Sequence, residues 1–181
     1  MSHRTWWVVV LVFVLGAASQ LPAKEKECNE CKVKTVVPQF GKLKQLVGKW
    51  EGVHKNMMTG KREKVVVTYR LTAGGSALIE TLFPGTPQEM VSVYHGDGDD
   101  LVMTHYCMLG NQPTMRSEDG PDANPITFEF DGGTGIKSIK DPHMHALTVT
   151  FVDKNHFNQE WVFFENGKAK HDEALKFSRV Q

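Results

Sequence analysis

The fold is decided by residues 64–95, which read KVVVTYRL, TAGG, SALIETLF, PGTPQ and EMVSVYH in succession. The first, third and fifth pieces are short runs of β-branched and apolar residues, whereas Gly and Pro are concentrated in the pieces between them. Runs of this length bounded by turn residues are typical of strands joined as hairpins. The stretch therefore predicts neighbouring antiparallel strands.

The same pattern continues outward from this stretch in both directions. Further strands are expected at residues 50–55, 101–109, 126–130, 145–152, 157–164 and 168–177. Residues 40–47 space apolar side chains three and four apart, which predicts one short helix ending at Gly48. Residues 110–125, interrupted by Gly and Pro, are expected to form the one long loop. The sequence thus predicts an all-β fold of about nine antiparallel strands after a short N-terminal helix, as a sandwich or a closed barrel.

The balance of charge excludes one class of partner. The chain has 181 residues, with 21 Lys and Arg against 21 Asp and Glu, so its formal net charge is +0 at pH 7. Nucleic-acid binding requires an excess of Lys and Arg on some face, because phosphates must be neutralised. No basic tract provides one, and we expect no nucleic-acid partner.

The N-terminus has the features of an export signal. Basic residues near the start precede Trp6–Ala18, a run without charged or amide side chains, and small residues precede a possible cleavage site before Gln20. The run is about 13 residues long, shorter than the roughly 20 that an apolar helix needs to span a bilayer. We expect residues 1–19 to be a signal peptide and the mature protein to be periplasmic or secreted, without membrane contact. An uncleaved anchor is the alternative.

The cysteines give little sign of catalysis. Cys28 and Cys31 lie in residues 20–39, a segment rich in Lys and Glu that we interpret as a linker. A thioredoxin-like site would require a preceding strand, and a haem attachment site would require His where Lys32 stands. In an exported chain we expect a small local disulfide or a pair of linker thiols. Cys107 lies in an apolar run, where a free Cys behaves as a small hydrophobic residue.

Residues 43–50, which read LKQLVGKW, carry a resemblance to a known family. They place a short helix ahead of Gly48-Lys49-Trp50 at the start of the first expected strand. This arrangement resembles the calycins, the barrels that include lipocalins and nitrobindin-like proteins. The resemblance implies a closed barrel in which Trp50 covers one end and a basic residue near the last strand, here Arg179, packs on it.

The rest of the chain is similar to a bacterial lipocalin-like domain family of unknown function. The similarity lies in Gly74-Gly75 before a strand, in MVSVYH at 90–95, and in His105-Tyr106-Cys107 followed by GNQP. It implies one barrel domain over residues 40–181. A nitrobindin-type haem would need a His ligand near the C-terminus, where His171 is only a distant candidate. The resemblance therefore leaves the cofactor unknown.

Strand parity indicates which side chains face the interior. Alternate side chains point to opposite faces, and the face with more apolar residues is expected to be buried. In several strands this face also carries polar residues, namely Tyr69, His105, His145 and Gln159. A buried polar group without a partner costs about 1 to 3 kcal/mol, so such a set calls for a hydrogen-bond network, water or a ligand. There are two alternatives to a ligand site. These polar side chains could hydrogen-bond to one another, or they could lie near the mouths of the barrel.

We therefore predict an exported barrel that binds a small apolar or amphipathic molecule in its interior. The expected site residues are Tyr69, His105, Cys107, His145, Gln159 and Trp161. The loop at 110–125 would cover one mouth as a lid, and Arg116 would reach across it to anchor an acidic head group. A surface loop that only caps the barrel is the alternative.

Other chemistry has less support in the sequence. His143 and His145 face the same side of a strand and can chelate a metal, but nothing in the sequence brings a third ligand to them, so we assign no metal site. No nucleophile elbow is present, and we assign no catalytic residue. The alternatives to a binding barrel are an enzyme that uses His105 with Tyr69 or Glu80 as an acid–base pair, and an interaction module with a packed core. The oligomeric state is not indicated.

Overall fold

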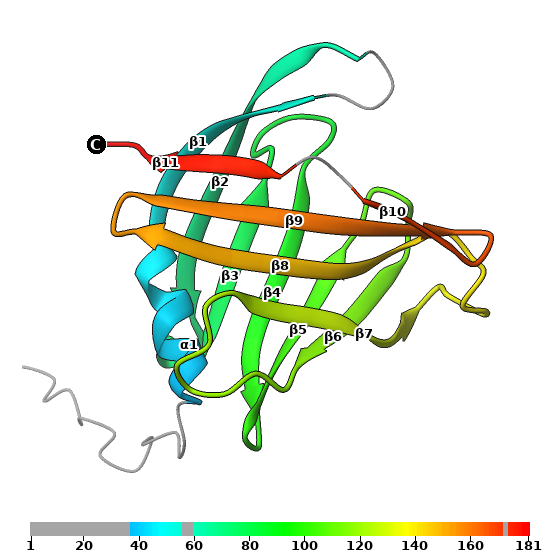
Figure 1. The fold of residues 1–181 in the computed structure, drawn as a ribbon, viewed down its shortest axis with the longest axis horizontal. Helices are drawn as coiled ribbons and strands as arrows, with labels where there is room; N and C mark the ends of the chain where they lie inside the picture. The colour runs from blue at the N-terminus through cyan, green and yellow to red at the C-terminus, as the bar shows by residue number, and fades with distance from the viewer. Residues whose placement is uncertain (1–36, 56–59, 172–173) are drawn as a thin grey trace, which may run out of the picture. The chain divides into compact units, whose positions relative to one another are not determined.

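A closed antiparallel barrel of 10 strands dominates the computed structural model, which describes residues 37–55, 60–171 and 174–181 (Figure 1). The elements in chain order are α1 (Pro38–Leu43), the 3-10 turn η1 (Lys44–Leu46), β1 (Gly48–Lys55), β2 (Arg62–Thr72), the 3-10 turn η2 (Ala73–Gly75), β3 (Ala77–Leu82), β4 (Met90–Asp97), β5 (Asp100–Tyr106), β6 (Gln112–Ser117), β7 (Ile126–Thr134), β8 (His143–Asp153), β9 (His156–Glu165), β10 (Lys168–His171) and β11 (Leu175–Arg179). Strands β1 to β9 each pair with the next, and β11 lies between β9 and β1, which closes the ring. β10 pairs with β9 outside the ring.

Several expectations fall on parts of the chain beyond this description. The signal peptide at 1–19, most of the linker at 20–39 and the pair Cys28 and Cys31 lie outside the described residues. Among the residues that are described, no helix has the length and apolar character needed to cross a membrane.

The expected all-β class is confirmed, and the closed barrel is consistent with a calycin-like fold. The expected strand number is too low for two reasons. Residues 168–177 hold parts of two strands, β10 and β11, instead of one. Gln112–Ser117 forms β6, so the expected long loop at 110–125 is wrong.

Pro113 is the reason that the sequence pattern does not predict β6. Proline cannot donate to a strand ladder and is tolerated where the pairing is irregular. The β6–β7 register shifts between Pro113 and Met115, which is the irregularity that accommodates it. Asp131–Thr134 is the last part of β7 and lies on the other side of this shift.

One end of the barrel is covered by α1. The sequence predicts a short helix at 40–47, whereas the α-helix ends at Leu43 and continues as η1. Phe40, Leu43 and Leu46 are buried and join the barrel core. Lys42 Nζ donates to the Ala123 carbonyl at 2.9 Å, which ties α1 to the β6–β7 connection at the same end. We call this end the α1 end (Figure 1).

Trp50 and Arg179 meet at the α1 end as the calycin resemblance implies. Trp50 is 1% exposed, and its Nε1 donates to the Leu46 carbonyl at 2.6 Å. The Arg179 guanidinium carbon lies 4.0 Å from the centre of the Trp50 ring, a cation–π contact. Gly48 has a φ of +130°, and a Cβ there would lie 2.9 Å from an Arg179 nitrogen, so glycine is required at this position.

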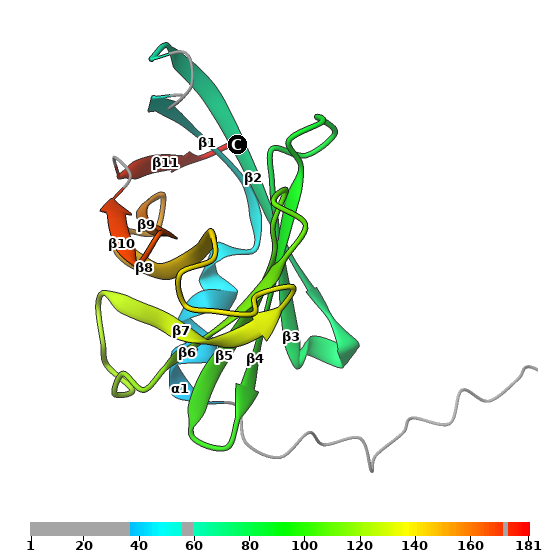
Figure 2. The same cartoon turned by 90° about the vertical axis from the view of Figure 1, so that its right-hand side faces the viewer.

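At the opposite end β1 finishes and β2 begins, and this end carries the β3–β4, β5–β6, β7–β8 and β9–β10 connections. We call it the open end. Partly buried apolar side chains pack against the core beside these connections, namely Phe83, Met90, Met144 and Leu175. Figure 2 shows β9 on one side of the barrel and β3 to β5 on the other, and the contact between the rings of His105 and Trp161 joins β5 to β9 across it.

Candidate functional site

The centre of the barrel contains a buried carboxyl group, that of Glu80 on β3. Its side chain is 1% exposed and accepts hydrogen bonds from three neighbours. Tyr69 donates to Oε1 at 2.9 Å, Tyr94 donates to Oε2 at 2.6 Å, and Gln159 Nε2 donates to Oε1 at 2.7 Å. We call these four residues the Glu80 network. It joins strands β2, β3 and β4 to β9 on the far wall.

The regular antiparallel ladder brings these side chains together. Tyr69 is directly opposite Glu80 in the β2–β3 register, and Tyr94 lies on β4, the next strand. Gln159 comes from β9 and also donates to the Tyr69 hydroxyl, at 2.8 Å. The network therefore forms only when the sheet closes into a barrel.

All three donors to Glu80 are neutral. Burial raises the pKa of Tyr69 and of Tyr94 well above the ordinary tyrosine value, and the nearby charge of Glu80 raises both further. The Gln159 amide carries no charge. Among the described side chains, no Lys, Arg or His forms an ion pair with Glu80. Each of these three contacts suits a carboxyl oxygen that accepts a hydrogen bond.

Two buried polar atoms beside the network have no hydrogen-bond partner in the described part of the chain. They are Gln159 Oε1, an acceptor, and Trp161 Nε1, a donor. Gln159 is 0% exposed and Trp161 4% exposed, and their spacing of two residues on β9 points both to the interior. Each unpartnered atom costs about 1 to 3 kcal/mol of desolvation. The interior therefore differs from a core in which every buried polar atom has a hydrogen-bond partner.

His105 lies across the barrel from Trp161. The two ring centres are 4.9 Å apart, although one ring comes from β5 and the other from β9. His105 Nδ1 contacts the Ser92 hydroxyl at 3.0 Å, and burial lowers the pKa of His105 to about 4. The imidazole is therefore neutral near pH 7. The His105–Trp161 contact lies on the open-end side of Gln159, because β9 runs toward the open end.

The structure thus brings Tyr69, His105, Gln159 and Trp161 into one interior, as strand parity predicts. Cys107 does not join them. It follows the end of β5, where its amide donates to the Asn111 carbonyl at 3.1 Å in a tight turn. The thiol is partly exposed, and burial raises its pKa. β5 ends at Tyr106, three residues earlier than expected, which moves Cys107 from the strand into the turn.

His145 is also misplaced by the parity rule. The β8–β9 register shifts between Met144 and Ala146, which leaves His145 as an extra residue in β8. Its ring stacks on Phe164, with centres 4.2 Å apart. Phe164 lies an odd number of residues from the inward-facing Trp161, so it belongs to the outer face. His145 also stacks on Phe130 of β7, with ring centres 5.4 Å apart, so it belongs to a cluster of rings on β7, β8 and β9 and is not a member of the Glu80 network.

His143 and His145 do contact each other. His143 Nδ1 lies 2.6 Å from the Asp141 carbonyl, which can only accept, so this nitrogen carries the proton. His143 Nε2 then accepts from His145 Nδ1 at 3.0 Å. Burial lowers the pKa of His145, and its neighbour His143 lowers it further. Among the described residues, no group of three or more His, Cys, Asp or Glu is arranged to hold a metal ion.

Arg116 does not reach across the open end. It lies on the outer face of β6, where its guanidinium donates to Asp97, Asp100 and Asp131 at 3.0, 3.1 and 3.0 Å. These hydrogen bonds raise its pKa. The expected anchor for an acidic head group is thus wrong, because the strand that replaces the loop turns Arg116 away from the interior.

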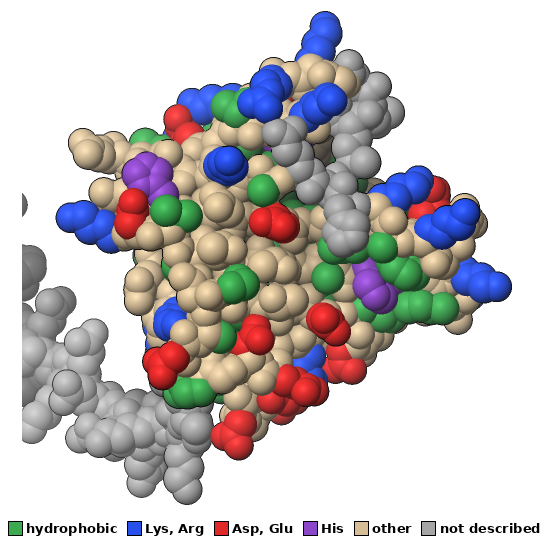
Figure 3. Space-filling model, in the orientation of Figure 1, with side chains coloured by type: hydrophobic (Ala, Val, Ile, Leu, Met, Phe, Trp, Pro, Cys, Tyr) green, Lys and Arg blue, Asp and Glu red, His purple; other side chains and the backbone are tan. Residues whose placement is uncertain are grey.

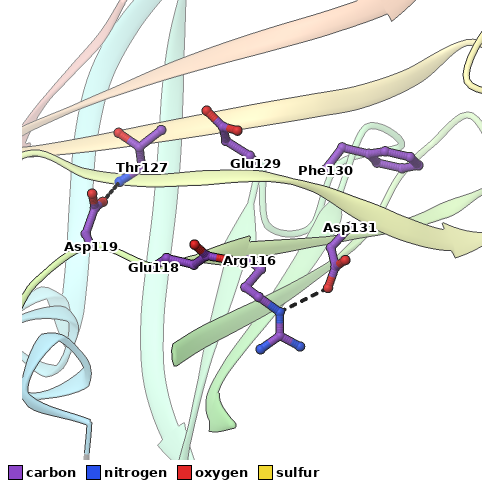
Figure 4. Close-up of a pocket in the computed structure, with 7 residues that line it drawn as sticks. All are labelled: Arg116, Glu118, Asp119, Thr127, Glu129, Phe130 and Asp131. Carbon is purple, nitrogen blue, oxygen red and sulfur yellow. Dashed lines mark hydrogen bonds and ion pairs between the residues drawn. The ribbon is translucent and has the colours of Figure 1, made fainter. Parts of the chain in front are cut away.

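A surface pocket of about 410 Å³ lies next to Arg116 (Figure 4). Its lining is mostly acidic, namely Arg116, Glu118, Asp119, Thr127, Glu129, Phe130 and Asp131. Figure 3 shows acidic side chains gathered over this part of the barrel wall. The pocket opens on the outer surface of β6 and β7 and is separate from the interior.

Sequence reasoning left Tyr94 and Ser92 out of the site, and it named Glu80 only in the enzyme alternative. Residues 76–83 are apolar on both faces, so parity does not decide whether Glu80 points inward. The short connection at 72–75 contained the necessary signal, because it sets the register that places Glu80 opposite Tyr69.

Comparisons with models of known protein families and with curated proteins find no match. The functional argument therefore rests on the barrel and on the geometry of its interior.

Proposed function

We propose that this protein is an exported, lipocalin-like barrel that binds a small amphipathic molecule in its interior. A ten-stranded barrel is compatible with ligand binding, since small barrels of this kind can enclose one small ligand. Ligand sites typically combine apolar walls with a few placed polar groups. The Glu80 network, His105 and Trp161 provide the polar groups, and the surrounding core is apolar.

The observation that carries the proposal is the pair of unpartnered atoms on β9. Gln159 Oε1 lacks a donor and Trp161 Nε1 lacks an acceptor, although both are buried. A ligand with polar atoms at one end supplies both partners. The apolar side chains beside the open end, Phe83, Met90, Met144 and Leu175, provide a surface for its apolar part.

Entry from the open end requires a local rearrangement. His105 and Trp161 meet across the interior, and a ligand that approaches Gln159 must displace at least one of these rings. The neutral state of His105 makes this easier, because no ion pair has to be broken.

The interior favours binding over acid–base catalysis. No described hydrogen bond joins His105 to Tyr69 or Glu80, so the acid–base pair is not assembled by a direct contact. The second candidate is an interaction module with a packed core. It is favoured by the complete burial of the apolar interior, for example of Val65, Met103 and Phe128, each 0% exposed.

Binding is tested by native mass spectrometry. The full chain is incubated with a cell extract, desalted and measured under conditions that preserve complexes. We expect a recurrent small-molecule adduct that the double variant His105→Ala, Gln159→Ala loses. Arg116→Gln, on the outer face, is the control and should keep the adduct. An adduct that persists in the double variant would contradict an interior site, and a bare protein would favour the packed module.

Export is tested separately. The proposal rests on the Trp6–Ala18 run, and it requires a mature chain that begins at Gln20. Cell fractionation followed by N-terminal sequencing should find this mature form outside the cytoplasm. An intact N-terminus on a cytoplasmic protein would contradict the proposal.

A further inference from the structure

We propose that the interior site selects a ligand whose polar end is a protonated amine next to a neutral oxygen acceptor, in place of an acidic head group. This inference rests on the proposed binding function. It concerns only the chemistry of the ligand's polar end, and it follows from the charge and the unpartnered atoms of the barrel centre.

Glu80 has no cationic partner among the described residues. Its donors are two phenols and an amide, all neutral, and among the described residues Glu80 forms no ion pair. A buried carboxylate is costly unless it is paired as well as hydrogen-bonded. An ammonium group next to Glu80 supplies the missing charge. A carboxylate or phosphate head group would instead be repelled there.

The unpartnered atoms specify the rest of the head group. Gln159 Oε1 needs a donor, which an ammonium N–H provides. Trp161 Nε1 needs an acceptor, which a hydroxyl or carbonyl oxygen provides. Side chains two residues apart on one strand face start about 7 Å from each other, a span that an amine and an oxygen on neighbouring carbon atoms can bridge through their hydrogen bonds.

Aromatic rings pack against both tyrosines of the Glu80 network. The Tyr69 ring centre lies 5.9 Å from that of Phe157, and the Tyr94 ring centre lies 5.5 Å from that of Phe128. Ring faces attract cations, and more strongly when water is excluded. Arg116, the residue that the sequence offered to an acidic head group, is held outside the barrel by three aspartates.

The test compares four probes with the same eight-carbon chain: octylamine, aminooctanol with its hydroxyl next to the amine, octyl alcohol and octanoate. Each is titrated calorimetrically into the full chain at about pH 7, where the amines are protonated and octanoate is ionised. We expect the amines to bind at least about tenfold more tightly than the alcohol, the factor typical of a charge-assisted hydrogen bond. Octanoate should bind most weakly.

Two variants and one control identify the residues responsible for the preference for amines. Glu80→Gln should remove the advantage of octylamine over octyl alcohol, whereas Glu129→Gln, which neutralises an exposed carboxylate on β7, should keep it. Trp161→Phe retains an aromatic ring and loses the N–H donor. It should abolish the advantage of aminooctanol over octylamine and preserve the preference for amines.

The outcomes separate this inference from the binding function. Octanoate binding as tightly as octylamine, or an amine preference that survives Glu80→Gln, would overturn the inference and leave interior binding intact. Failure of all four probes to bind would overturn both. The order of affinities of the four probes for the unchanged protein tests the inference even if Glu80→Gln does not fold.

Discussion

Replacing Trp50 by Ala should remove about 4 kcal/mol from the free energy of unfolding. The side chain is 1% exposed at the α1 end of the barrel. Its ring packs edge-on against Phe157, with centres 4.8 Å apart, and lies under the Arg179 guanidinium. The truncation therefore affects β1, β9 and β11 at the same time.

The magnitude follows from these contacts. Truncation of a buried aromatic side chain to Ala costs about 3 to 5 kcal/mol. Part of this cost is the Leu46 carbonyl, which loses its donor at 2.6 Å, a loss of about 1 kcal/mol. Another part is the cation–π contact with Arg179, about 0.5 to 2 kcal/mol. Because small domains have only about 5 to 15 kcal/mol of stability, the variant loses a large share of it.

Urea unfolding followed by circular dichroism measures the loss. With a slope of about 2 kcal/mol per molar urea, the midpoint should fall by about 2 M. Val53→Ala on the same strand is the matched control, because Val53 is 50% exposed and its truncation should change stability by less than about 0.5 kcal/mol. A loss below about 1 kcal/mol for Trp50→Ala would refute the view that this residue closes the barrel.

Four further changes test other parts of the molecule. Gly48→Ala should cost about 1 to 3 kcal/mol in the same urea assay, because the backbone has a φ of +130° and the new Cβ meets Arg179. His105 has a folded pKa of about 4 against 6.5 in the unfolded chain, so the unfolded state binds more protons and stability falls by about 3 kcal/mol as pH drops through this window. His105→Gln should flatten that pH profile. Arg116→Gln should leave ligand affinity unchanged and lower the melting temperature slightly, more at low salt than at high salt, because its three ion pairs lie at the surface. Cys28→Ser should leave the unfolding midpoint unchanged, since a local disulfide closing so short a loop constrains the unfolded chain little.

The sequence predicts those features that depend on regular periodicity. Tyr69, His105, Gln159 and Trp161 lie on uninterrupted strands, where alternate residues share a face, and all four are found in the interior. The barrel class follows from the same regular strands. The contact between Trp50 and Arg179 came from the family resemblance instead, since no local pattern links two residues at opposite ends of a domain.

The rule that alternate residues share a face fails where the strand pairing is irregular. His145 is an extra residue in β8, so alternate residues no longer share a face there, and no feature of the surrounding sequence predicts this irregularity. Pro113 and nearby glycines made β6 look like a loop, which placed Arg116 at the open end instead of on the barrel wall. Both errors come from irregular pairing that depends on neighbouring strands.

Glu80 was left out of the predicted binding site for a different reason. Both faces of residues 76–83 are apolar enough to be buried, and only the partners across the barrel decide which one is. The hydrogen bond from Gln159 joins residues 79 positions apart in the chain. Such a network depends on closure of the barrel, which is a tertiary property.

The indole N–H signal of Trp161 in a two-dimensional nitrogen–proton NMR spectrum tests the central claim most directly. The signal is assigned with Trp161→Phe and followed while aminooctanol is added to the full chain. We expect it to shift as Nε1 gains an acceptor, whereas the Trp50 signal stays in place because that N–H already donates to Leu46 at the α1 end. A Trp161 signal that does not move at saturating ligand would contradict binding inside the barrel.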